Sequence, residues 1–184
     1  MSSASDSPLT ATAALYKKTD KFAFHFTRNK LRYDPVFLAV LESGLIQSNM
    51  RVLDLGCGQG LLLALLHVAQ NQYQSGLWPN IRPEPASHLD LRGVELPNSK
   101  AAIARLALGS AAKIESLDLS QCEIPAADVV LLFDVLHYLD ANAQVSLISR
   151  ITRAIPAGGL LRVRDANAVC EFAVGGATSA ILLA

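Results

Sequence analysis

A short apolar strand that runs directly into three alternating glycines limits most strongly how this chain can fold. Residues 52–60 read Val-Leu-Asp-Leu-Gly-Cys-Gly-Gln-Gly, and residues 61–70 continue with the apolar content of a buried helix. Glycine permits φ values that other residues avoid and lets the backbone approach a ligand closely. The start of the helix adds unpaired N–H groups. The segment therefore predicts a strand–turn–helix unit whose turn binds a ligand.

Strand and helix patterns alternate along the rest of the chain. The run 127–134 is apolar almost without interruption, which is typical of a central parallel strand covered on both faces. Further expected strands lie at 51–55, 91–95, 113–117 and 160–164, with helices at 61–70, 97–108 and 140–155. This alternation predicts an α/β fold, with a Rossmann-like, mainly parallel sheet of at least five strands and helices on both faces.

The length of 184 residues suits a single domain over 15–184, preceded by a Ser/Ala/Thr-rich tail at 1–14 that we expect to be disordered. Within the domain, 15–48 holds most of the aromatic residues and predicts a helical cover before the sheet. Residues 49–165 form the expected cofactor-binding core, and 166–184 form a short C-terminal segment.

Composition narrows the classes of partner. Lys plus Arg and Asp plus Glu both number 16, so the net charge of zero gives no general attraction to nucleic acid, and we expect no nucleic-acid partner. The three cysteines, Cys57, Cys122 and Cys170, are far apart and form no metal-ligand pattern, so we expect no metal. We see no secretory signal and no apolar run of membrane-spanning length, which favours a cytoplasmic protein.

The glycine pattern also discriminates between cofactors. It is G-x-G-x-G rather than the dinucleotide fingerprint G-x-G-x-x-G, because position 61 is leucine. Asp54, just before the glycines, would repel a pyrophosphate but can accept hydrogen bonds from a cationic amino-acid group. Leu61 and Asp54 therefore favour S-adenosylmethionine over a nicotinamide dinucleotide.

Glu95 ends the second expected strand, where the ligand crevice of an open α/β sheet lies. A carboxylate there can accept hydrogen bonds from both ribose hydroxyls. It follows Asp54 by 41 residues, about twice the usual spacing, and the Pro-rich stretch 71–90 would absorb the difference as a surface loop. Asp118 follows the third strand, either as a partner for the adenine amino group or as an ordinary turn residue.

Five segments resemble, in the correct order, the successive motifs of class I S-adenosylmethionine-dependent methyltransferases, namely 52–60, 93–95, 117–119, 127–139 and 156–161. Residues 22–31 and 34–37 are similar to small bacterial methyltransferases. The resemblance implies that the cofactor is bound by Asp54, Gly56, Cys57, Gly58, Gly60, Glu95, Asp118, Leu119, Phe133 and Asp134. It also implies that Arg28 or Lys30, on the helical cover, pairs with the methionine carboxylate.

The family implies transfer of a methyl group to a small-molecule acceptor, and we expect an oxygen nucleophile. Alignment of the acceptor supplies much of the catalysis, and a general base helps when the acceptor is a hydroxyl. His137, just past the fourth strand, is the predicted catalytic base. His25 and Tyr33 are alternatives from the helical cover.

The chain departs from the family pattern at its C-terminal end. Class I methyltransferases usually continue past the fifth strand with a helix and an antiparallel strand pair, but only 20 residues follow Arg164 here. We expect those antiparallel strands to be missing or incomplete and the sheet edge to be exposed, with homodimerisation through that edge. A catalytically silent, methyltransferase-like cofactor-binding or partner subunit is the alternative function.

Overall fold

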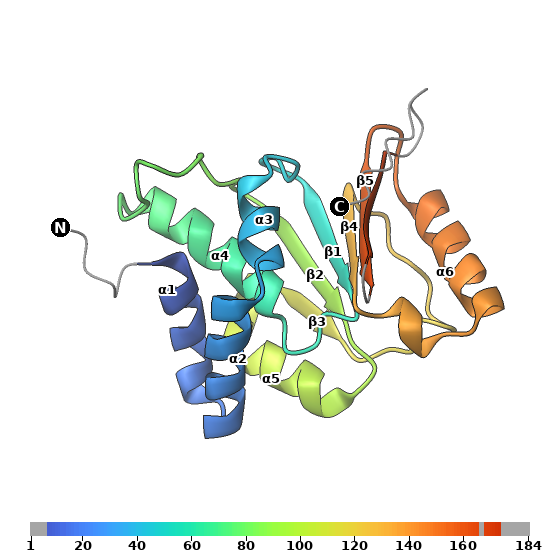
Figure 1. Cartoon of the computed structure of the whole chain (residues 1–184), viewed down its shortest axis with the longest axis horizontal. Helices are drawn as coiled ribbons and strands as arrows, with labels where there is room; N and C mark the ends of the chain where they lie inside the picture. Colours follow the sequence, from blue (N-terminus) through green and yellow to red (C-terminus); the bar gives the residue numbers. More distant parts are fainter. Residues whose placement is uncertain (1–6, 166–167, 174–184) are drawn as a thin grey trace.

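The sheet is the centre of the computed structural model, which describes residues 7–165 and 168–173. In that part of the chain six strands form one sheet in the order β3-β2-β1-β4-β5-β6 (Figure 1). The strands are β1 (Arg51–Leu55), β2 (Asp90–Val94), β3 (Lys113–Glu115), β4 (Val129–Phe133), β5 (Leu160–Asp165) and β6 (Ala168–Ala173). β1 to β5 pair in parallel and β6 pairs antiparallel to β5.

Helices cover both faces of the sheet, as the alternation predicts. The described helices are α1 (Pro8–Leu15), α2 (Lys21–Tyr33), α3 (Val36–Glu42), α4 (Leu61–Gln74), α5 (Asn98–Leu108) and α6 (Ala141–Ala154), with 3₁₀ turns η2 (Tyr16–Lys18), η3 (Gly109–Ala111) and η4 (Leu136–Tyr138). Figure 1 shows α1, α2, α4 and α5 on one side of the sheet and α6 on the other.

β4 shows why its sequence is continuously apolar. Val129 and Leu131 belong to the core under α1, α3, α4 and α5, whereas Val130 and Leu132 belong to the core under α6. Alternate side chains of a strand point to opposite faces, and both faces of β4 are buried. The central position predicted for this strand is confirmed.

The chain runs from β1 through β2 to β3 on one side and then returns to place β4 on the other side of β1. The carboxyl ends of β1 and β4 therefore diverge at a switch in strand order. A crevice for ligands lies outside the sheet at such a switch. The fold thus positions the glycine turn after β1 next to the segment that follows β4.

The N-terminal region differs from the expected disordered tail. Residues 8–14 belong to α1, which packs against α4 and α2 and buries Ala13. Thr12 Oγ1 donates a hydrogen bond to the carbonyl of Pro8 at 2.7 Å, so the hydroxyl is paired inside the helix. Residues 1–6 lie outside the described part. The helical cover consequently begins at Pro8.

At the other end, β6 supplies one antiparallel strand and pairs along the whole of β5, from Leu160 opposite Ala173 to Asp165 opposite Ala168. The edge of β5 is therefore covered within the described residues. The expectation of an exposed edge at β5 is therefore wrong, and β6 supplies one strand of the expected antiparallel pair. Residues 174–184 lie outside the described part.

Candidate active site

A cavity of about 620 Å³ opens at the carboxyl edge of the sheet, at the switch in strand order. Most of the predicted site residues meet there, although they come from four different segments. Its lining includes Asp54, Gly56, Cys57, Gly58, Glu95, Asp118, Leu119, Phe133 and Asp134. Gly60 and His137 are not among the lining residues.

The turn after β1 depends on two glycines in the left-handed region. Gly56 has φ +74° and Gly58 has φ +58°, values that L side chains rarely adopt. Gly56 N donates to the carbonyl of Val94 at 2.8 Å, which ties the turn to the end of β2. Nothing lies within 4 Å of the Cβ position of Gly58, so the backbone faces open space there.

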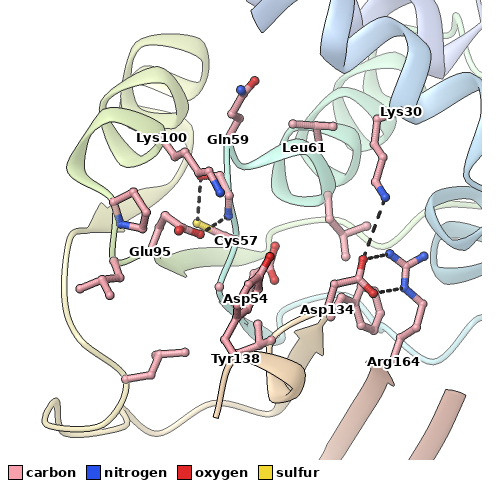
Figure 2. Close-up of a pocket in the computed structure, with 18 of the residues that line it drawn as sticks. Lys30, Asp54, Cys57, Gln59, Leu61, Glu95, Lys100, Asp134, Tyr138 and Arg164 are labelled. Atoms are coloured by element: carbon pink, nitrogen blue, oxygen red, sulfur yellow. Dashed lines mark hydrogen bonds and ion pairs between the residues drawn. The ribbon is translucent and has the colours of Figure 1, made fainter. Parts of the chain in front are cut away.

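Glu95 reaches this turn directly. Gly58 N donates to Glu95 Oε2 at 2.6 Å, and Glu95 is buried, with 7% of its surface exposed. Figure 2 shows its carboxylate beside Cys57, below the turn. The long loop before β2 therefore does not move Glu95 away from the glycine turn. Its carboxylate lies where it can contact a ligand that the turn holds.

Asp54 forms the floor of the cavity at the end of β1. Its side chain is buried, and this burial, together with the nearby charge of Glu95, raises the pKa of Asp54 to about 7. A carboxylate in such surroundings gains from a cation that replaces the lost solvation. The two acids thus favour a ligand that brings positive charge and hydroxyl donors to the turn.

Asp118 lies in a turn at the edge of the cavity. Its Oδ1 accepts a hydrogen bond from Ser120 N at 2.8 Å, as in a tight turn, and the hydrogen bonds from Ser120 lower the pKa of Asp118. It also lines the cavity together with Leu119. Leu117, on the other side of Asp118 in the sequence, does not line it.

The helical cover closes the opposite wall. Tyr16 is fully buried, and its hydroxyl donates to the carbonyl of Gln59 at 2.8 Å, which fixes the cover to the glycine turn. Phe26 and Lys30 of α2 and Phe37 of α3 then line the cavity. Arg28 is placed differently, because its guanidinium lies 5.9 Å from the ring of Phe24.

A charge network joins this cover to the ends of β4 and β5. Arg164 Nη1 donates to both oxygens of Asp34 at 2.8 and 2.9 Å, while Nε and Nη2 donate to Asp134. Lys30 Nζ lies 2.8 Å from Asp34 Oδ2 and 4.0 Å from Asp134 Oδ2. Figure 2 shows Lys30 and Arg164 both directed at Asp134. This network forms the cavity wall opposite Glu95.

The network also sets the ionisation of its members. Burial alone would raise the pKa of Asp34, but hydrogen bonds from Lys30 and Arg164 outweigh it, and the pKa lies below its usual value.

Asp134 has φ +57°, an uncommon conformation for a residue other than glycine. Such backbone is retained where the surroundings enforce it, often at functional sites. Sequence reasoning missed Arg164, although a strand with arginines at 162 and 164 calls for acidic partners.

His137 lies just outside the cavity, on η4. Its Nδ1 is 2.9 Å from Asp165 Oδ1, and its backbone N donates to Asp165 Oδ2 at 3.0 Å. The neighbouring Tyr138 lines the cavity, with its ring centroid 4.0 Å from that of His137. The structure therefore places His137, the predicted base, next to a lining residue of the cavity but not on the cavity wall.

Gly60 serves the packing of the turn. It is the N-cap of α4 with φ +75°, and a Cβ there would lie 3.0–3.1 Å from side-chain atoms of Leu108 and Ala104. The glycine allows α5 to pack closely on the start of α4.

The lining fits a sulfonium nucleoside. Four acids and three bases line the cavity, Asp54, Glu95, Asp118 and Asp134 against Lys30, Lys100 and Arg164, so its formal charge is −1 when all are ionised. S-adenosylmethionine carries a sulfonium, an ammonium and a carboxylate, with a net charge of +1. The donor set therefore matches the cofactor in both charge and hydrogen-bonding type.

Comparison with known proteins identifies the family of this chain. The model of a family described as a methyltransferase domain matches residues 24–180. No curated protein matches the chain by sequence.

Solved structures show the same fold at low identity. Coclaurine N-methyltransferase, bound to N-methylheliamine and S-adenosylhomocysteine, superposes with a TM-score of 0.54 at 22% identity, over 70% of this chain and 34% of that one. The [4+2]-cyclase SpnF superposes with a TM-score of 0.53 at 19% identity, over 75% of this chain and 46% of that one. A TehB-like S-adenosylmethionine-dependent methyltransferase from Corynebacterium glutamicum superposes with a TM-score of 0.54 at 21% identity, over 82% of this chain and 72% of that one. The chain thus spans half or less of the length of the first two.

The family assignment follows from the extent of the match. The matched region runs from α2 through β6 and contains the glycine turn, Glu95 and the ends of β4 and β5. The sheet is the Rossmann-like sheet of these proteins. The chain therefore belongs to the methyltransferase domain family and has the fold of the class I S-adenosylmethionine-dependent methyltransferases.

Proposed function

We propose that this chain transfers a methyl group from S-adenosylmethionine to an oxygen nucleophile of a small-molecule acceptor. The observation that carries this proposal is the continuation of the cavity past the glycine turn. There the rings of Phe26, Phe37 and Phe133 line a space between the helical cover and the ends of β4 and β5. Apolar walls with a few polar groups are typical of small-molecule sites.

The residues divide into three tasks in this proposal. Glu95 accepts hydrogen bonds from the ribose hydroxyls and Asp118 faces the adenine, with Leu119 against the ring. Asp54 and the turn hold the amino-acid end, and Lys30 pairs with its carboxylate. We prefer Lys30 to Arg28 because Lys30 lines the cavity.

The cofactor supplies an activated methyl group on a sulfonium, and the protein aligns the acceptor oxygen with it and excludes water. The new C–O bond forms as the C–S bond breaks, the electron pair passes to sulfur, and the acceptor proton leaves to a base. We propose His137 as that base. Asp165 accepts from its Nδ1, which leaves Nε2 as the basic nitrogen of the neutral ring.

The test is incubation of the purified chain with methyl-labelled cofactor and a matched panel of phenols, carboxylic acids, amines and thiols. We expect labelled product from a phenol or an acid. We also expect His137→Asn to lower kcat for that acceptor about a hundredfold without changing the affinity for S-adenosylhomocysteine. Transfer to amines or thiols alone would refute the oxygen acceptor, and an unchanged kcat in the variant would refute the base.

Cofactor binding should depend on pH through Asp54. Because the pKa of Asp54 is raised to about 7, its carboxyl group is mostly protonated below that pH. A bound ammonium would favour the ionised form of this carboxyl group. We expect the affinity for S-adenosylhomocysteine to rise as pH increases from 6 and to level off about one pH unit above the pKa, with proton release that decreases over the same range.

Calorimetric titration in buffers of different ionisation enthalpy measures the released proton. Asp54→Asn should abolish both the release and the pH dependence. A parent protein that binds with no proton release at pH 6 would contradict an Asp54–ammonium contact.

A further inference from the structure

The basic residues of this neutral chain are concentrated in one short stretch. Residues 17–33 contain six of the 16 lysines and arginines and only one of the 16 acids, Asp20. The formal charge of this segment is therefore +5, and that of the remaining residues is −5. It comprises most of η2 and all of α2, the outer part of the helical cover.

α2 buries its small residues and exposes its aromatic ones. Ala23, Thr27 and Leu31 face the interior, whereas Phe22, Phe26 and Tyr33 are 77%, 42% and 73% exposed. An ordinary surface helix shows the opposite arrangement, with its large apolar side chains against the core. This aromatic face is therefore largely exposed in the described part of the chain.

The three aromatic residues lie on one side of α2, because positions 22, 26 and 33 fall on one helical face. The rings of Phe22 and Phe26 stack with centroids 6.4 Å apart. Exposed Lys21, Arg28 and Arg32 flank this face. α5, which contacts η2, adds two basic residues and no acidic one.

From this arrangement we propose that α2 and η2 dock this protein onto an anionic lipid bilayer. The aromatic face enters the interface between headgroups and acyl chains while the flanking lysines and arginines remain at the phosphates. Amphipathic helices that lie in the bilayer plane combine these two features, and each basic residue near an anionic surface adds to the attraction. No helix of the described residues is long and apolar enough to cross the bilayer, so attachment is at the surface.

The orientation that follows places the cavity at the membrane. Phe26 and Lys30 line the active-site cavity and also a shallow hollow on the outer face of α2, with Phe22, His25 and Asn29. An amphipathic acceptor held in the bilayer would therefore meet the cavity without crossing water. Docking itself does not depend on the identity of the acceptor or on methyl transfer.

Co-sedimentation with vesicles tests the docking. We expect the protein to bind phosphatidylcholine vesicles that contain about 30% phosphatidylglycerol at least about tenfold more tightly than pure phosphatidylcholine vesicles. The binding should weaken when salt rises from about 50 mM to about 500 mM. Equal binding to both kinds of vesicle, or binding to neither, would overturn the proposal.

Two matched pairs of variants separate this surface from the rest of the molecule. Lys17→Glu/Lys18→Glu should lower binding to the anionic vesicles about tenfold or more, whereas Lys113→Glu/Arg153→Glu, with the same change in charge, should lower it less than about threefold. Phe22→Ser/Tyr33→Ser should also weaken it. Leu77→Ser/Ile81→Ser, which alters two exposed apolar residues elsewhere, should not.

Equal losses in the two members of either pair would refute a specific docking face. Thermal melts of all four variants should match the parent, since the altered side chains are exposed. A single-stranded oligoribonucleotide bound more tightly than the anionic vesicles, with the same sensitivity to Lys17→Glu/Lys18→Glu, would replace the membrane with nucleic acid as the partner.

Discussion

Replacing Glu95 with glutamine is expected to weaken S-adenosylhomocysteine binding about ten- to a hundredfold. Glutamine keeps the size of the side chain and one carbonyl oxygen to accept the hydrogen bond from Gly58 N. It loses the charge that would strengthen hydrogen bonds from the two ribose hydroxyls. Hydrogen bonds to charged groups contribute about 1.5–3 kcal/mol, and 1.4 kcal/mol corresponds to a factor of ten in affinity.

The same variant should fold as well as the parent. The charge of Glu95 helps to raise the pKa of Asp54 to about 7, so the folded protein pays for ionising Asp54 as pH rises from about 4 to about 7. Glutamine removes this repulsion and offsets the weaker hydrogen bond to Gly58. At pH 7.5 we expect a melting temperature within about 3 °C of the parent.

Glu115→Gln is the matched control for this experiment. Glu115 ends the neighbouring strand β3 and is bonded to Lys113 at 3.2 Å, but it does not line the cavity. Its variant should bind S-adenosylhomocysteine within about twofold of the parent. If Glu95→Gln also bound within twofold, the ribose would not lie at Glu95 and the cofactor placement proposed above would be wrong.

The parts of this fold that the sequence predicted are those specified by residues close together in the chain. β1, the glycine turn and α4 follow one another without a gap, so one stretch of about 20 residues specifies them. The N-cap of α6 is equally local, since Asp140 Oδ1 accepts a hydrogen bond from Ala143 N at 2.9 Å. Parallel pairing then follows from the helices between the strands, because a helical crossover returns the chain to the same end of the sheet before the next strand begins.

Helix boundaries and faces were predicted less well. In α6 the apolar residue Val145 is 72% exposed, whereas Leu147 and Ile151 are buried. Residues 8–14, expected to be disordered, form most of α1 because α4 and α2 supply the surface that it needs. Their own composition carries no strong helical period, so the sequence alone had no signal for this packing.

The charge network on the cavity wall is the main feature that the sequence did not reveal. Arg164 forms hydrogen bonds with Asp34, which is 130 residues away, and with Asp134, which follows the neighbouring strand β4. Nothing near Arg164 in the sequence specifies these partners, because the sheet register and the position of α3 decide them. The same limit applies to His137, whose distance from the cavity depends on the path of η4.

Gly56→Ala should destabilise the protein by about 2–5 kcal/mol and should also abolish measurable cofactor binding. An alanine there must adopt φ +74°, and its Cβ would lie 2.3 Å from Cγ2 of Val135. The left-handed conformation costs about 1–2 kcal/mol and overpacking about 1–3 kcal/mol. Because Val135 lines the cavity, its displacement would deform the wall. Denaturant unfolding measures the first effect and calorimetric titration the second.

Gly58→Ala provides the comparison within the same turn. Its φ is +58°, but nothing lies within 4 Å of its Cβ position, so only the backbone cost applies. We expect a loss of about 1–2 kcal/mol, which is smaller than that at Gly56. Equal losses at the two positions would show that contact with Val135 contributes nothing.

Removing the obstructing side chain separates the steric cost from the backbone cost. In Gly56→Ala/Val135→Ala the two Cγ atoms are gone, and the remaining Val135 Cβ lies 3.6 Å from the new methyl group, an ordinary contact. The double variant should therefore be about 1–2 kcal/mol more stable than the sum of the single variants predicts, because residues in direct contact couple in this way. It should still be less stable than the parent, since the left-handed backbone remains. If the losses of stability in the single variants simply added, the turn would move away from Val135 in Gly56→Ala. In that case β1 would not hold Gly56 rigidly against the segment following β4.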